Sequence, residues 1–179
     1  VKLVVFGLLA ASLIAAVYVV ATSDGLNDRF GRPLGTDFSN VYAAGTYVLD
    51  GNAAAPFDPP RQYAREQAIF GADTQFYGWH YPPYFLGLAA LLAAMPYALA
   101  LVLWQGVTFA LYLWVTREIL NTGRARALAD PLWLPLVIGF PAVFVNLGHG
   151  HNGFLTAALF GAALLQLDRK PVLAGVLFG

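Results

Sequence analysis

The side chains of this sequence that could do chemistry lie in a polar stretch from Ser23 to Tyr81 and in a short turn containing His149 and His151. The polar stretch holds seven of the ten acidic residues and four of the ten lysines and arginines. Carboxylates can transfer protons, and guanidinium groups can hold anions. We therefore expect a functional site in these two segments.

Asp37 is the strongest candidate within the polar stretch. It follows Gly35 near the start of a short helix predicted over Ser39 to Leu49, where a carboxylate could face a cavity at a membrane surface. The alternative is that Thr36, Asp37 or Ser39 serves as a helix N-cap. The remaining aspartates of this stretch lie beside residues typical of turns, which explains them without a function: Asp24, Asp28, Asp50, Asp58 and Asp73.

The two histidines near residue 150 lie in an otherwise apolar region, where an ionisable group indicates function. The surrounding pattern Gly148-x-Gly150-x-x-Gly153 would let backbone amides approach an anion such as a lipid phosphate. An interfacial turn with tightly packed glycines is the alternative. Metal binding is not predicted, because histidines two residues apart on a helix point to nearly opposite faces.

Four further residues could bind the substrate. His80 lies in the segment Trp79-His80-Tyr81-Pro82-Pro83, whose aromatic residues are typical of a membrane interface, which leaves the histidine unexplained. Arg32, Arg61 and Arg65 could hold a phosphate, although solvated loop arginines are the common alternative.

The composition indicates a membrane protein. Hydrophobic residues make up 59% of the 179-residue chain and charged residues 11%, and the net charge is zero, which argues against a nucleic-acid partner. There is no cysteine, so disulfides, thiolate zinc sites and cysteine nucleophiles are excluded within this sequence. The bilayer is the first expected partner.

Leu3 to Thr22 is an uncharged run of 20 residues, about 30 Å long as a helix, which matches the hydrocarbon core. A cleaved signal peptide is the alternative, but the run exceeds the usual apolar region of such peptides. With Lys2 inside, residues 23–81 form an outer loop. We expect this loop to contain two short interfacial helices, over Ser39 to Leu49 and Arg61 to Phe70.

The rest of the chain is predicted to be helical as well. Met95-Pro96 divides a short helix, Pro82 to Met95, from a full-length span, Tyr97 to Thr116. The region from Pro131 to Leu167 gives two short helices, broken at residues 148–153.

These helices can cross the membrane in two ways. If every segment crosses, the basic residues fall outside, against the positive-inside rule: Arg117, Arg124, Arg126, Arg169 and Lys170. If Pro82 to Met95 or Pro131 to Leu147 crosses incompletely, Arg169 and Lys170 return inside and the histidine turn lies on the side of the loop. We favour this second topology.

We therefore expect an all-α, polytopic transmembrane bundle forming a single integral membrane domain over residues 1–179. The apolar run begun at Pro171 still continues at Gly179, so we expect this sequence to be the N-terminal part of a longer protein.

Several segments, in their order and spacing along almost the whole chain, resemble glycosyltransferase family 87, bacterial membrane enzymes of the GT-C superfamily. They are Gly35-Thr36-Asp37-Phe38, Tyr81-Pro82-Pro83, Met95-Pro96-Tyr97 with the run to Trp104, residues 152–159 and residues 169–175. One departure is Gly150-His151, where the family usually has Gly-Gln.

The resemblance implies a GT-C-type, multi-pass enzyme of the bacterial cytoplasmic membrane. Such an enzyme moves a hexose, often mannose, from a polyprenyl-phosphate donor to a lipid or glycan acceptor on the outer side, with no cofactor beyond the lipid-linked donor. An aspartate in the first outer loop serves as general base in the family, and Asp37 matches that position.

We therefore expect a sugar transfer with inversion, in which Asp37 activates the acceptor hydroxyl and polyprenyl phosphate departs. The phosphate needs positive or amide-rich groups but no general acid, which explains one carboxylate instead of a glycosidase pair. Two alternatives are a transporter with the histidines in a broken-helix site and a non-catalytic membrane assembly subunit. The sequence shows no internal repeat that would favour a transporter.

Overall fold

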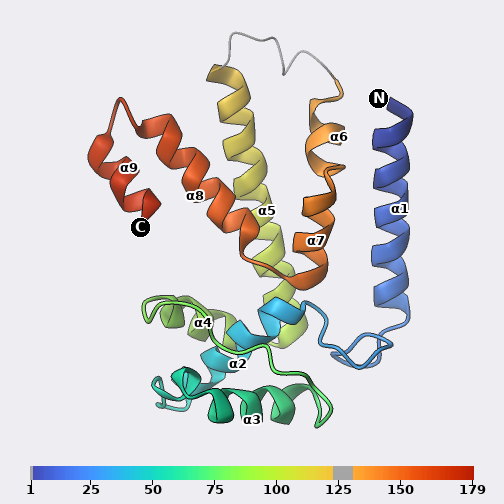
Figure 1. The fold of residues 1–179 in the computed structure, drawn as a ribbon, viewed down its shortest axis with the longest axis vertical. Helices are drawn as coiled ribbons and strands as arrows, with labels where there is room; N and C mark the ends of the chain where they lie inside the picture. The colour runs from blue at the N-terminus through green and yellow to red at the C-terminus, as the bar shows by residue number, and fades with distance from the viewer. Residues whose placement is uncertain (1, 123–130) are drawn as a thin grey trace. The chain divides into compact units, whose positions relative to one another are not determined.

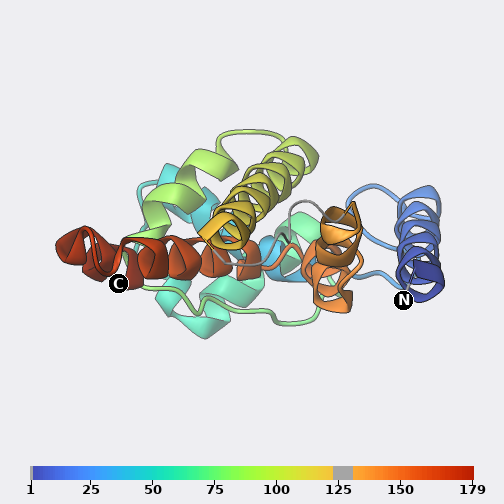
Figure 2. The same ribbon diagram turned by 90° about the horizontal axis from the view of Figure 1, so that it is seen from above.

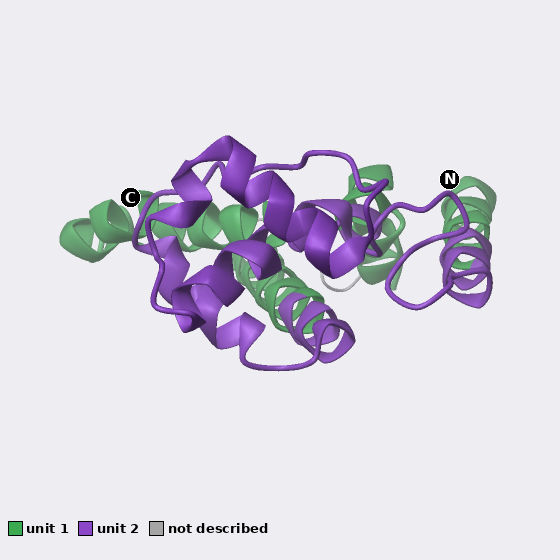
Figure 3. Cartoon of the chain, turned by 90° about the horizontal axis from the view of Figure 1, so that it is seen from below, with its two compact units in different colours: residues 1–13, 105–146, 152–179 green, residues 14–104, 147–151 purple. Residues whose placement is uncertain are grey.

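The computed structural model describes residues 2–122 and 131–179, and in these ranges the chain is all-helical, with 71% helix and no strand. It divides into two compact units, coloured separately in Figure 3. Unit 1 comprises Val1–Leu13, Gln105–Asn146 and Asn152–Gly179, and unit 2 comprises Ile14–Trp104 and Leu147–His151. Each unit is described by itself.

Two helices of the described ranges are long and apolar enough to cross a membrane, α1 (Lys2–Ala21) and α5 (Tyr97–Thr122), both labelled in Figure 1. The side chains of α1 are exposed along almost its whole length, although most of them are apolar. The predicted span from Leu3 to Thr22 is thus confirmed as a helix. The predicted helix from Tyr97 begins where expected but continues six residues past Thr116, where Arg117, Glu118 and Leu120 favour helix.

Unit 2 contains the polar loop, which is folded into helices. These are α2 (Thr36–Leu49), the short 3₁₀-helix η1 (Ala55–Phe57) and α3 (Pro59–Phe70), followed by α4 (Phe85–Ala93). The two helices predicted for the loop are confirmed, and each begins two or three residues earlier than expected. Proline is tolerated in the first turn of α3 because a backbone N–H at this position would have no partner within the helix.

Helices α2 and α4 pack against each other at Gly45. A Cβ atom at this glycine would lie 2.1 Å from the carbonyl oxygen of Ala89 and 2.7 Å from the Cβ of Ala93. The close backbone approach therefore requires glycine. Helix α4 has only 9 residues, because residues 82–84 form a turn before it. At about 13 Å, α4 alone is too short to cross a bilayer.

Unit 1 contains α6 (Trp133–Ile138), most of α7 (Pro141–His149), α8 (Gly153–Gln166) and α9 (Pro171–Phe178). The prediction of one helix from Pro131 to Leu147 was wrong, because the chain breaks at Gly139 and Phe140 and Pro141 starts a new helix. Helices α8 and α9 pack against each other (Figure 2).

The predicted break at residues 148–153 is confirmed, with Gly150 at φ 65°. Of the predicted basic loop, Arg117 lies in α5, whereas Arg124 and Arg126 fall outside the described residues.

Candidate functional site

Asp37 is the second residue of α2, and the residue before the helix is Gly35 in the left-handed conformation, at φ 74°. A Cβ atom on Gly35 would lie 2.8 Å from a methyl group of Leu101. No side chain caps this helix end, so the predicted N-cap role for Thr36, Asp37 or Ser39 was wrong. The Asp37 side chain keeps 34% of its surface exposed, and its carboxylate is not used for capping.

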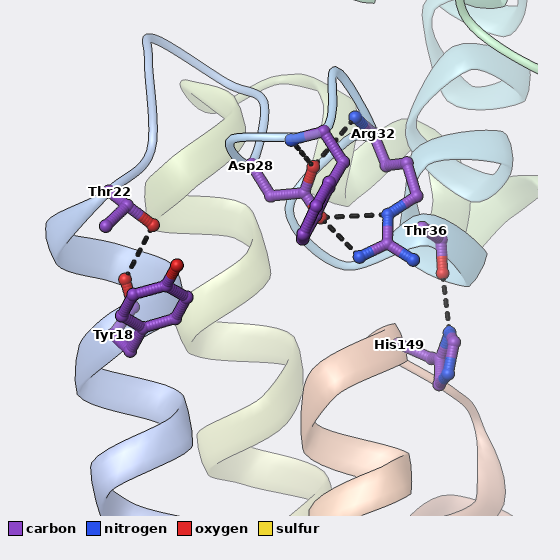
Figure 4. Close-up of polar contacts among 7 residues, drawn as sticks. Tyr18, Thr22, Asp28, Arg32, Thr36 and His149 are labelled. Atoms are coloured by element: carbon purple, nitrogen blue, oxygen red, sulfur yellow. Dashed lines mark hydrogen bonds and ion pairs between the residues drawn. The ribbon is translucent and has the colours of Figure 1, made fainter.

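The turn after α7 brings both histidines of the predicted pair to the start of α2, within unit 2. The Thr36 hydroxyl lies 2.7 Å from His149 Nδ1 in a hydrogen bond, and the two side chains point toward each other in Figure 4. His151 Nε2 lies 3.8 Å from Asp37 Oδ2, an ion pair when the imidazole is protonated. Residues more than 110 positions apart in the sequence thus form one cluster.

The histidine turn is itself held by packing and by one hydrogen bond. The indole N–H of Trp104 donates to the carbonyl oxygen of Gly150, at 3.1 Å. A Cβ atom on Gly150 would lie 2.7 Å from the Cβ of Phe38, so this turn and α2 approach at backbone distance. Trp104 therefore helps to position the histidines.

Two tyrosines of the segment before α4 lie within electrostatic reach of Asp37. Burial raises the pKa of Tyr81, and the negative charge of Asp37 raises it further. Burial also raises the pKa of Tyr77, an effect opposed by Arg32 and reinforced by Asp28, Glu66 and Asp37. Both phenols are neutral hydrogen-bond donors at physiological pH. The sequence assigned Tyr81 to an interfacial aromatic belt, and no local pattern linked it to Asp37.

Arg32 lies in the loop that leads into α2 and pairs with Asp28. Its Nε and Nη2 donate to Asp28 Oδ2 at 2.9 and 2.7 Å, and the amides of Phe30 and Arg32 donate to Oδ1. Burial alone would raise the pKa of Asp28, but these hydrogen bonds and the charge of Arg32 outweigh it and lower the pKa below 3.8. The turn interpretation of Asp28 is confirmed, and Figure 4 shows the pair.

Arg61 and Arg65 lie elsewhere in unit 2, around Tyr47 of α2. The Arg65 guanidinium lies 4.0 Å from the centre of the Tyr47 ring and pairs with Asp50 at 2.7 Å. The Tyr47 hydroxyl donates to the carbonyl oxygen of Arg61. Because Tyr47 follows Asp37 by ten residues of helix, about 15 Å separates them. The structure therefore does not bring these arginines to the Asp37 cluster.

His80 is exposed, and its Nε2 lies 3.0 Å from the carbonyl oxygen of Tyr77. It belongs to the same segment as Tyr81, and the hydrogen bond that the structure shows for its ring stays within that segment. In the described part of the chain, no group of three or more His, Cys, Asp or Glu residues could hold a metal ion. The cluster offers one carboxylate, two imidazoles, a hydroxyl and nearby phenols, which suits proton transfer beside an anion.

Comparison with known proteins identifies the family. The sequence profile of glycosyltransferase family 87 matches residues 79–179, more than half of the chain. The matched range includes His80, Tyr81 and the histidine turn, whereas Asp37 lies before it. Neither the curated proteins nor the solved structures gave a match. The profile match shows that the chain belongs to glycosyltransferase family 87.

Proposed function

We propose that this glycosyltransferase moves a hexose, with mannose as the first candidate, from a polyprenyl-phosphate donor to a lipid or glycan acceptor. The transfer takes place on the outer side of the bacterial cytoplasmic membrane, in a polytopic bundle of GT-C type. Family membership and two helices able to cross a membrane support this proposal. The observation that carries it is the distance of 3.8 Å between Asp37 Oδ2 and His151 Nε2.

In the proposed reaction, the Asp37 carboxylate accepts the proton of an acceptor hydroxyl while the hydroxyl oxygen attacks the anomeric carbon. The bond from that carbon to the phosphate oxygen breaks, and its electron pair leaves with the polyprenyl phosphate. Attack opposite the leaving group inverts the configuration. A positioned base of this kind contributes about 10²–10⁴ in rate.

The departing phosphate needs compensation of its negative charge. His149 and His151 are the first candidates because they lie beside Asp37, and Arg32 and His80 come next. Fixed donors and positive groups near a leaving anion lower the barrier without a proton transfer. Arg61 and Arg65 have no part in phosphate binding in this mechanism, because they lie around Tyr47.

The test uses membranes that contain the full-length protein, with membranes lacking it as the control. Labelled polyprenyl-phosphate mannose, polyprenyl-phosphate glucose and the corresponding nucleotide sugars are supplied separately. We expect transfer from a lipid-linked donor and none from the nucleotide sugars once synthesis of the lipid-linked form is blocked. Transfer that needs only a nucleotide sugar would refute the proposed donor class.

A further inference from the structure

Glu66 of α3 is a carboxylate whose side chain has no exposed surface. Acidic residues are almost never fully buried unless other groups compensate their charge, and burying a charge without compensation costs several kcal/mol. Such a residue commonly serves a purpose other than stability. The mechanism proposed above does not use Glu66.

Both oxygens of Glu66 accept hydrogen bonds from a distant part of the chain. The amide of Tyr77 donates to Oε2 and the amide of Gly78 donates to Oε1, each at 2.9 Å. Residues 75–80 belong to no helix or strand, so their amides lack the partners that regular structure would supply. The Glu66 carboxylate therefore clamps this irregular segment to α3.

A third donor connects the clamp to α2. The side-chain amide of Gln62 donates to Glu66 Oε1 at 3.2 Å and to the backbone oxygen of Asn40 at 3.0 Å. Gln62 is fully buried, and Asn40 lies three residues after Asp37 in α2. The clamp is thus tied to the helix that carries the proposed base.

Ring contacts connect the clamped segment to the histidine turn: Tyr81 packs on Phe85, Phe85 packs on Trp104, and Trp104 donates to the carbonyl oxygen of Gly150. Tyr77 contributes one of the clamped amides, and Tyr81 follows four residues later. The centre of the Tyr81 ring lies 5.1 Å from that of Trp79 and 4.6 Å from that of Phe85, on which it stacks. These contacts fix the end of the segment against α4. Glu66 thereby fixes the start of this segment, at Tyr77 and Gly78, and the ring contacts of Tyr81 fix its end.

We propose that Glu66 is a positioning residue that holds residues 77–81 as a wall of the Asp37 site, with the phenols of Tyr77 and Tyr81 oriented toward the acceptor sugar or lipid hydroxyls. This inference rests on the proposed function. A carboxylate suits the task because both of its oxygens only accept, whereas the NH₂ group of a glutamine would face one of the two amides.

The test compares Glu66→Gln with Asp58→Asn in the full-length protein. Asp58 is an exposed carboxylate at the start of the same helix with no side-chain capping bond, which makes it a matched control. Hydrogen exchange of residues 76–81 is measured together with kcat and KM for sugar transfer. In Glu66→Gln we expect exchange at Tyr77 and Gly78 to rise and kcat to fall, each by about tenfold to a hundredfold, with KM for the donor within about twofold. In Asp58→Asn, neither exchange nor kcat should change.

Glu66→Asp provides a second variant should Glu66→Gln fail to fold, since it keeps the charge but is too short to reach both amides. Unchanged exchange in the folded variant would refute the clamp. Faster exchange with unchanged kcat would refute the positioning role. Absence of transfer by the wild type would refute the proposed function and the positioning role with it, and exchange would still show whether the clamp exists.

Discussion

At the scale of single residues, the Thr36 hydroxyl and the His149 imidazole join the start of α2 to the histidine turn. Replacing Thr36 with valine preserves the shape of the side chain but removes the 2.7 Å hydrogen bond. We expect the free energy of unfolding to fall by about 0.5–1.5 kcal/mol and transfer to fall by up to about tenfold. Thermal unfolding and transfer rates check this. Thr22→Val, which loses an exposed hydroxyl at the end of α1, should leave transfer unchanged.

The buried carboxyl group of Glu66 should make the free energy of unfolding depend on pH. Burial raises its pKa above 4.5, although the amides of Tyr77 and Gly78, the Gln62 amide and a protonated His80 act in the opposite direction. A raised pKa means that the charged carboxylate, although the two amides bond it, is harder to form in the folded protein than in the unfolded chain. The contribution of this raised pKa to the free energy of unfolding is therefore complete below pH 4.5, and it is lost as the pH rises through the raised pKa.

Relative to Glu66→Gln, the melting temperature of the wild type should thus decrease as the pH rises above 4.5. Both proteins are measured in the same detergent from pH 4.5 to pH 8. A difference in Tm that stays constant, or that changes in favour of the wild type with rising pH, would contradict the account.

Residue types and local context were enough to single out Asp37, His149 and His151 separately. Nothing local predicted that they would meet, because that depends on long-range packing of the histidine turn against α2. Nothing in the sequence singled out Glu66, since its burial follows from tertiary structure. The capping role of Asp37 was wrong because Gly35 in a left-handed conformation already starts the helix.

At the scale of elements, the contact between α2 and α4 depends on Gly45. Replacing it with alanine would place a methyl group 2.1 Å from the carbonyl oxygen of Ala89, so the helices must separate. We expect Gly45→Ala to cost about 1–3 kcal/mol of stability. Gly87→Ala in α4 is the matched control, because no atom lies within 4 Å of its added Cβ. It should be neutral or stabilising by up to about 1 kcal/mol, and an equal loss in both variants would refute the packing argument.

Most helix positions could be predicted because proline and glycine mark their ends. Pro96 divides α4 from α5, and the glycines around residue 150 end α7. The break between α6 and α7 was missed, although Gly139 and Pro141 stand there, because the apolar run around them has the composition of one continuous helix. Composition indicates where apolar helices occur but resolves short breaks within them poorly.

At the scale of the whole molecule, the favoured topology puts the polar loop outside and Arg169 inside. The sequence contains no cysteine, so single introduced thiols report their side of the membrane against the unsubstituted protein as background. Ala53 and Arg169 are both exposed, in the turn after α2 and in the turn before α9. We expect Ala53→Cys to react with an impermeant maleimide in intact cells and Arg169→Cys only after permeabilisation. The reverse pattern would contradict the topology.

If Asp37 is the base of a sugar transfer, its replacement by asparagine should slow that transfer. Initial transfer rates of wild type and Asp37→Asn are therefore compared at equal abundance in membranes. Asp58→Asn serves as the control for loss of a loop carboxylate. Because the Asp37 side chain is partly exposed and caps no helix, the variant should fold as the wild type does. We predict a decrease of about a hundredfold or more in Asp37→Asn alone. Transfer at the wild-type rate by Asp37→Asn would contradict the account.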